Sequence, residues 1–302
     1  RPPRSTLFPY TTLFRSCFGH ECAQRVGAKT IDAALAWIAQ AERPWFVWVH
    51  LYDPHGPYTP PTRDERLDAT RASLASHVLD RRAIPPYQRV GDERDAAEFI
   101  DRYDHEIAYA DAQLARLFAA VNQDSTVIAV HADHGEALGE DDYWFRHGSL
   151  LHDAALRIPL ILAGPGVPVG RVETDPIRTL DVAPTLLALA GWTHALPAAE
   201  GSVWRPGAPV AAARSRIAEA RAEELVHDGT GIDTRHKLRL VEPGLDLTWW
   251  PATDERVVVG DATRVDDAVA RLREWLARTA SLPPRGPVPD DLPDALRALG
   301  YK

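Results

Sequence analysis

Metal-ligating side chains follow directly after an apolar run near the middle of the chain. Residues 127–130 (Val-Ile-Ala-Val) have the length and composition of a buried parallel strand, and Asp133 and His134 come at its carboxyl end, before a tight turn at Gly135. In open α/β sheets, ligands bind at that edge of the sheet. A carboxylate oxygen beside an imidazole nitrogen offers two ligands to a divalent cation. The alternative for this segment by itself is a surface turn in which Asp133 bonds nearby backbone.

A second apolar run ends in the same way. Residues 44–51 (Pro-Trp-Phe-Val-Trp-Val-His-Leu) are typical of a strand, and they lead into the loop Asp53-Pro-His55-Gly-Pro-Tyr58. Proline cannot donate to a sheet ladder, so the strand should end near Asp53 and continue as a rigid loop that holds His55. A lone histidine is more often structural, but two strands that both deliver a histidine favour a shared cleft.

A third candidate is His147, in the aromatic and charged loop of residues 141–148. The pattern after this loop predicts a short helix within residues 149–157 and a strand over residues 158–163, closed by a Gly-Pro-Gly turn. A further helix is predicted over residues 179–191, where a glycine ends it.

Two amphipathic helices are predicted earlier in the chain, over residues 27–43 and 101–121. Their apolar faces are expected to contain Ile31, Leu35 and Ile38 in the first helix, and Ile107, Leu114 and Leu117 in the second. Asp104 and Glu106 are expected to be exposed or packing polar groups rather than catalytic acids. The Arg- and Asp-rich residues 59–100 between the helices are interpreted as a lid or substrate-contacting excursion, with a solvated loop as the alternative.

The last third of the chain predicts a smaller subdomain. Residues 192–212 are rich in proline, alanine and glycine and form a link. Strands are expected near residues 215–220, 225–233, 236–241 and 246–250. A closing helix should present Leu272, Trp275 and Leu276 on its apolar face.

These motifs, in this order, resemble the sulfatase family of the alkaline-phosphatase superfamily, most closely over residues 25–191. Each motif is weak by itself, but the series is specific. The matching runs are Asp53-Pro-His-x-Pro-Tyr58, Tyr103-Asp-x-Glu-Ile-Ala-Tyr-x-Asp111, Asp133-His-Gly-Glu136, His147-Gly148, Leu156-Arg-Ile-Pro-Leu-Ile161, Leu180-Asp-Val-Ala-Pro-Thr-Leu-Leu187 and Leu296-Arg-Ala-Leu-Gly-Tyr301.

The resemblance implies an α/β fold, namely an alkaline-phosphatase-like three-layer sandwich with a mostly parallel central sheet whose N-terminal part is missing. A small C-terminal α+β subdomain with antiparallel strands would follow. The expected division is an artefactual, non-native segment at residues 1–16, a truncated catalytic domain at residues 17–212, and the subdomain and tail at residues 213–302.

The resemblance also assigns site residues. Asp133 and His134 would bind one divalent cation, which is calcium by resemblance, while the imidazole ligand leaves magnesium or manganese open. His55 would be catalytic, helping to break down a covalent sulfate adduct or contacting the ester. His147 would be catalytic too, lying over the leaving-group oxygen or a sulfate oxygen, although many relatives have lysine there.

The implied activity is that of a sulfuric ester hydrolase acting on a small-molecule or saccharide sulfate ester through a formylglycine nucleophile. The alternatives are a phosphodiesterase or phosphonate monoester hydrolase of the same superfamily, and a catalytically inactive remnant. Formylglycine arises from a Cys/Ser-x-Pro-x-Arg motif upstream of the Asp-Pro-His run, and neither Cys17 nor Cys22 begins one. Residues 6–16 look like a translated sequencing adapter. The chain is therefore expected to be a C-terminal fragment with negligible turnover of an aryl sulfate in added calcium.

The composition agrees with a folded domain and excludes some partners. Hydrophobic residues make up 45% and charged residues 25% of the chain, both near the averages for globular proteins. The net charge of −9, without a basic stripe, argues against nucleic-acid binding. No run is long enough to span a membrane. Localisation stays open between bacterial periplasm or secretion and cytoplasm, and the oligomeric state is open as well.

Overall fold

The computed structural model describes residues 25–148, 150–174, 176–192, 201–206, 215–220 and 235–280. The chain divides into two compact units, whose described residues run from 25 to 121 and from 122 to 280. Both cysteines, the segment 1–16 and the predicted strand at 225–233 lie outside the described residues. Within the described part, no helix combines the length and the apolar character that crossing a membrane requires.

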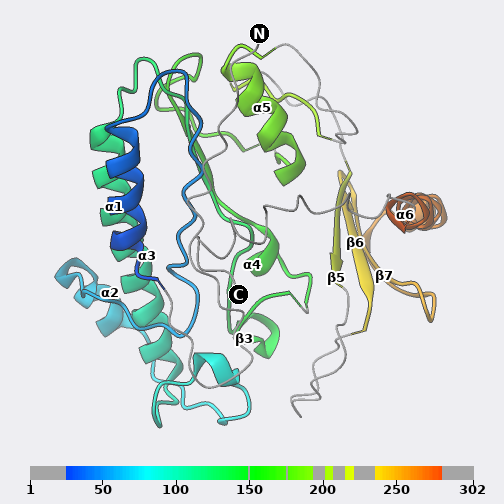
Figure 1. Cartoon of the computed structure of the whole chain (residues 1–302). Coiled ribbons are helices and arrows are strands. Elements are labelled where there is room, and N and C mark those ends of the chain that lie inside the picture. The colour runs from blue at the N-terminus through cyan, green and yellow to red at the C-terminus, as the bar shows by residue number, and fades with distance from the viewer. Residues whose placement is uncertain are drawn as a thin grey trace, which may run out of the picture. The chain divides into compact units, whose positions relative to one another are not determined.

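The first unit is built on two helices that lie side by side, α1 (Gly27–Ile38) and α3 (Ala96–Ala120) (Figure 1). Both confirm predicted helices, although α1 ends earlier and α3 begins earlier than the pattern indicated. The start of α3 is fixed by Asp95, whose side chain accepts a hydrogen bond of 3.0 Å from the backbone N–H of Ala97.

The short elements between these helices are η1 (Glu65–Leu67), α2 (Asp68–Ser73) and η2 (Pro86–Gln88). They form the excursion at residues 59–100, and a bridge between Val78 and Asp95 closes part of it. The excursion has a small core of its own, because Leu79, Ile84 and Gln88 are buried.

Two predictions for this unit are wrong. Residues 44–51 contain no strand in the structure, and only Val49 makes a bridge, so Phe46 and Trp48 are largely exposed. An apolar run becomes a strand only where a neighbouring strand pairs with it, and none of the named strands of the described residues does so. Ile107 was expected to be buried but is 44% exposed, because α3 turns its polar residues Glu106 and His105 inward.

The second unit begins with β1 (Ile128–His131) paired to β4 (Leu160–Ala163). The pair is antiparallel, with Ile128 opposite Ala163, and β1 is half-buried to exposed. The expectation of a buried parallel strand at residues 127–130 is thus wrong for this pairing. A hairpin of β2 (Ala137–Leu138) and β3 (Trp144–Arg146), with η3 (Glu140–Asp142) at its turn, lies between them in sequence.

The remaining predicted helices of this region are confirmed with changed bounds. The short helix is α4 (Asp153–Leu156). The second begins as η4 (Thr179–Asp181), continues as α5 (Val182–Leu189), and is followed by Gly191 with a φ of 79°, as the glycine stop predicted.

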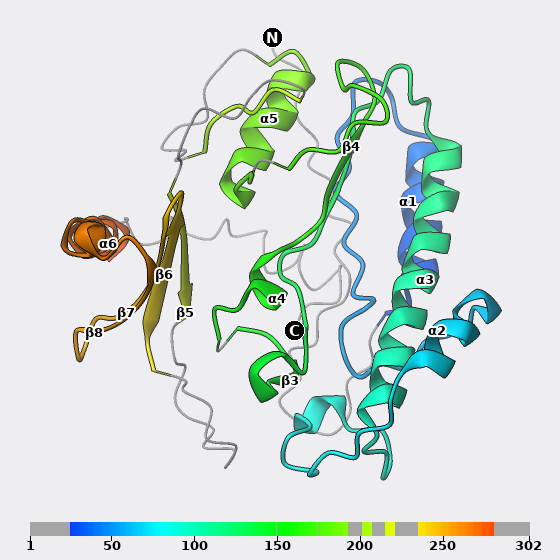
Figure 2. The same cartoon turned by 180° about the vertical axis from the view of Figure 1, so that it is seen from behind.

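A four-stranded antiparallel sheet ends the unit, in the order β5 (Arg216–Ala220), β6 (Lys237–Glu242), β7 (Leu245–Trp250) and β8 (Glu255–Gly260). After η5 (Ala262–Arg264), α6 (Val265–Ala280) covers one face of this sheet (Figures 1 and 2). The core between them contains Leu238, Leu240, Leu247, Trp249, Val269 and Leu272. The α+β prediction for this region is confirmed, β8 was not predicted, and the boundary at residue 212 stays a prediction.

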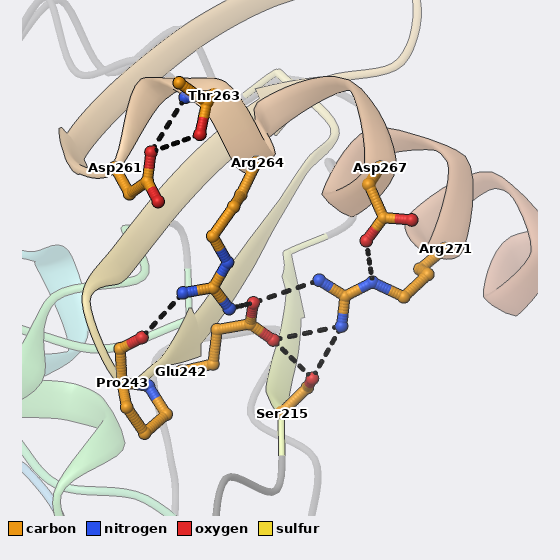
Figure 3. A network of polar contacts seen from close by, with 8 residues as sticks. All are labelled: Ser215, Glu242, Pro243, Asp261, Thr263, Arg264, Asp267 and Arg271. Carbon is orange, nitrogen blue, oxygen red and sulfur yellow. Dashed lines mark hydrogen bonds and ion pairs between the residues drawn. The ribbon is translucent and has the colours of Figure 1, made fainter.

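A buried carboxylate ties this sheet to its helix (Figure 3). Glu242 at the end of β6 accepts hydrogen bonds from Arg264, Arg271 and Ser215, and Arg264 also donates to the carbonyl of Pro243 at 2.8 Å. The Arg271 guanidinium, ahead of the opposing effect of burial, holds the pKa of Glu242 below its usual value. The network therefore fixes β5, β6 and α6 together as a structural element rather than a reactive site.

Candidate active site

The predicted metal ligands lie together where the chain leaves β1. The Oδ1 atom of Asp133 and the Nε2 atom of His134 are 3.7 Å apart. The Nδ1 atom of His134 lies 2.8 Å from the carbonyl oxygen of Gly135. A carbonyl only accepts, so Nδ1 carries the proton and Nε2 keeps the lone pair that a metal ligand needs.

The separation of these two atoms fits a single divalent cation. Two ligands at 2.3–2.6 Å from one ion, the range for calcium, would subtend an angle of about 90–107° at a separation of 3.7 Å. Within the described ranges, however, no group of three or more His, Cys, Asp or Glu side chains is placed to hold a metal. Asp133 and His134 therefore supply two donors, and a six- to eight-coordinate ion would need others.

The structure also brings His147 to this pair. Its imidazole ring stacks on that of His134, with ring centroids 3.7 Å apart and an angle of 18° between the planes. On its other side, His147 Nδ1 lies 3.4 Å from Oε1 of Glu136, a carboxylate that is only 5% exposed. Since a carboxylate accepts, this contact orients the ring with Nδ1 toward Glu136. Glu136 is a site residue that the sequence analysis did not single out.

The hairpin that carries His147 has an unusual backbone. Asp141, Asp142 and Phe145 all have φ between 51° and 61°, a backbone region that residues other than glycine rarely adopt. The Phe145 ring is fully buried, and the hydroxyl of Tyr143 donates to the carbonyl of His147 at 3.3 Å. Strained backbone held by buried aromatic rings is typical of a functional loop.

His55 lies in the first unit. Its Nδ1 atom is 2.8 Å from the carbonyl oxygen of Gly56, which places the proton on Nδ1 and the lone pair of the neutral ring on Nε2. Two phenol rings flank the imidazole: Tyr52 with ring centroids 4.5 Å apart, and Tyr87 at 5.7 Å. The loop holds His55 as the prolines predicted, with the backbone N–H of His55 donating to the carbonyl of Tyr52.

Two residues before His55, the half-buried Asp53 lies close to the start of α1 and to the buried Glu106. That helix has no capping side chain of its own. Instead, the backbone N–H of Ala28 donates to the hydroxyl of Tyr109 at 3.0 Å. The backbone N–H of Gly27 lies near the Asp53 carboxylate and opposes the rise of its pKa. Glu106 is 4% exposed and accepts from the backbone N–H of Thr59 at 2.9 Å.

Burial and the negative charge of Asp53 raise the pKa of Glu106 to about 7. Burial also raises the pKa of Asp53. Glu106 is a buried packing group, which is one of the two roles expected for it. The sequence did not predict that its pKa would be raised into the neutral range. The sequence signal that points to it is the family motif Tyr103-x-x-Glu106, which lies outside any apolar periodicity.

Comparisons with known proteins identify the family of this chain. The sequence model of the Sulfatase family matches residues 9–192, more than half of the chain. The choline-sulfatase of Rhizobium meliloti is 31% identical over 170 residues, which is 50% of this chain and 32% of that protein. A sulfatase of Formosa agariphila is 28% identical over 148 residues, 48% of this chain and 29% of that protein. The chain thus spans about a third of the length of these curated relatives.

Among solved structures, the phosphonate monoester hydrolase of Silicibacter pomeroyi superposes with a TM-score of 0.63 at 23% identity, covering 84% of this chain and 59% of that one. At this identity the likeness shows the fold, and it supports the predicted α/β class. The match of the family model over more than half of the chain shows that the chain belongs to the sulfatase family.

Proposed function

We propose that the protein is a sulfuric ester hydrolase that cleaves the sulfate ester of a small molecule or saccharide with the help of a divalent cation and a formylglycine nucleophile. The observation that carries the proposal is the placement of Asp133 Oδ1 3.7 Å from His134 Nε2, with the His147 ring stacked alongside. A pair of ligands next to a second imidazole suits the recognition of a tetrahedral anion beside a metal.

Asp133 and His134 would hold the cation, for which we propose calcium, with magnesium or manganese as alternatives. When bound, such a cation withdraws electron density from the sulfate oxygens and makes the sulfur more electrophilic. The carboxylate of Asp133 suits the hard ion, and its 78% exposed side chain leaves room for further ligands.

His147 would act through Nε2, because its Nδ1 atom faces Glu136. In its protonated form the ring carries a positive charge that the buried Glu136 carboxylate stabilises, and Nε2–H can donate to an oxygen on which negative charge develops. His55 would take up or release a proton at Nε2, the nitrogen opposite the Gly56 carbonyl contact.

Neither Cys17 nor Cys22 supplies the nucleophile that this proposal requires, because neither begins a Cys-x-Pro-x-Arg run. The run Ser281-Leu-Pro-Pro-Arg285 has the letters of the Ser-x-Pro-x-Arg pattern, but it follows the Asp-Pro-His run, the reverse of the family order, and lies outside the described residues. Sulfate and phosphate groups share tetrahedral geometry, so a phosphodiester or a phosphonate monoester is the alternative substrate.

Binding of 4-nitrophenyl sulfate tests the proposal, since binding requires no nucleophile. Isothermal titration of the 302-residue chain should show that it binds this ester when calcium is present. EDTA, which removes the calcium, should abolish the binding. His147→Ala should weaken binding about tenfold or more, because a hydrogen bond to a charged group contributes about 1.5–3 kcal/mol. His236→Ala, which alters a histidine paired with Glu219 in the C-terminal sheet, should leave the affinity unchanged.

Two outcomes would contradict the proposal. If neither EDTA nor His147→Ala changes the affinity for 4-nitrophenyl sulfate, then neither the cation nor His147 holds the ester. Tighter binding of a phosphonate monoester than of the sulfate ester, under the same conditions, would favour the alternative activity.

A further inference from the structure

We infer that Tyr87 is a specificity-determining residue, which receives the ring of an aryl or pyranosyl alcohol beside His55. The inference rests on the proposed sulfate-ester function and adds to it the part of the substrate that is not sulfate. It is carried by the way the excursion at residues 59–100 is fixed against the His55 loop.

The anchor is Gln88, the residue after Tyr87 in η2. Gln88 is fully buried, and it packs on the backbone of Gly56, the residue that follows His55. A Cβ atom at position 56 would lie 2.0–2.3 Å from the carboxamide atoms of Gln88, so this close packing requires glycine. The backbone N–H of Gln88 also donates to the carbonyl of Pro85 at 2.9 Å, and Ile84 is buried beside it in sequence.

This anchoring places the Tyr87 ring next to the imidazole of His55. The two rings are 5.7 Å apart at an angle of 27°, and Tyr52 lies on the imidazole at 4.5 Å and 45°. Tyr87 is 40% exposed, although its neighbours in the excursion's core are buried. A tyrosine that its neighbours hold in place offers a ligand a rigid, partly exposed contact surface at a low cost in conformational entropy.

The chemistry of the exposed face points to the alcohol half of the ester. Sulfate oxygens require cations or hydrogen-bond donors, and the face of a phenol ring offers negative quadrupole density instead. Such a face attracts flat apolar surfaces, which an aryl ring and the C–H face of a pyranose both present. Tyr87 therefore selects for ring-bearing esters, and an open-chain alkyl ester would gain nothing from it.

The test compares three esters on the 302-residue chain in calcium: 4-nitrophenyl sulfate, glucose 6-sulfate and ethyl sulfate. Tyr87→Ala should weaken the binding of one or both ring esters about tenfold, which corresponds to the loss of roughly 1.4 kcal/mol of stacking. The same substitution should weaken the binding of ethyl sulfate less than about twofold. Tyr87→Phe, which keeps the ring, should restore the affinity, and Val78→Ala, at an exposed position of the same excursion, should change nothing. The arm that responds, aryl or sugar, identifies the alcohol.

The resonances of the His55 ring protons provide a second readout, because removing the Tyr87 ring should shift them by loss of its ring current. Equal weakening of all three esters by Tyr87→Ala, or no effect on any, would overturn the inference while leaving the sulfatase proposal intact. If the unaltered chain binds none of the three esters, both the sulfatase proposal and this inference are contradicted.

Discussion

Gly135→Ala should reduce the affinity for the cation, and with it the affinity for a sulfate ester, by about 10- to 100-fold, because disturbing the groups that orient metal ligands typically costs that much. Gly135 follows the two proposed ligands, and its N–H donates to the carbonyl of Ala155 in α4 at 2.7 Å. A Cβ atom at position 135 would lie 2.1 Å from the carbonyl oxygen of Ala154, which is backbone and cannot rotate away. The loop that holds Asp133 and His134 must therefore move.

Calcium titration by calorimetry checks this expectation, with circular dichroism to confirm that the variant is folded. Gly170→Ala is the matched control. Gly170 has a φ of 69° and open space around it, so the added methyl group strains only the local backbone and should leave calcium affinity unchanged. A folded Gly135→Ala variant with the affinity of the unaltered chain would show that the contact with α4 does not position the ligands.

Glu106→Gln should stabilise the protein at alkaline pH. The pKa of Glu106 is about 7 in the folded chain, raised by burial and by Asp53, against an ordinary value of 4.5. The folded state therefore binds this proton more tightly than the unfolded state. The contribution of Glu106 to stability is fully present below about pH 4.5 and is lost as the pH rises through about 7, up to about 3 kcal/mol.

Glutamine keeps an oxygen that can accept from the N–H of Thr59 and carries no charge at any pH. Urea unfolding followed by circular dichroism should show the variant more stable than the unaltered chain by about 1–3 kcal/mol at pH 8, and the difference should shrink toward pH 5. Glu98→Gln is the control on the same helix: Glu98 is bonded to Arg102, so its removal should not stabilise the chain at pH 8. A Glu106→Gln variant that is less stable at pH 8 would contradict this account.

The sequence predicted which side chains lie close together better than it predicted the elements that carry them. Asp133, His134 and His147 were found from a strand end and a family motif, and the structure brings all three together. The strand itself was expected to be parallel, and it pairs antiparallel with β4. A run of apolar residues reports burial, whereas the direction of pairing depends on distant parts of the chain.

The buried polar residues of α3 could not be predicted from periodicity. Glu106 and His105 are buried because backbone N–H groups of Thr59 and Asp64 donate to them, and those partners are more than 40 positions away in sequence. An apolar stripe therefore placed Ile107 inside when it lies outside. The sequence likewise gave no reason to select Tyr87, because the charges of residues 59–100 suggested a solvated loop.

The central claim is that Asp133 and His134 bind a divalent cation, and the most direct test is to locate the site at which a metal ion binds. Manganese is paramagnetic and broadens the resonances of nearby nuclei, so substoichiometric Mn²⁺ added to the chain should broaden the imidazole signals of His134 and His147 first. Excess calcium should restore those signals by competition, and Asp133→Asn should weaken the effect. Broadening that begins at other histidines, such as His77 or His236, with the signals of His134 and His147 intact, would contradict the proposed metal site.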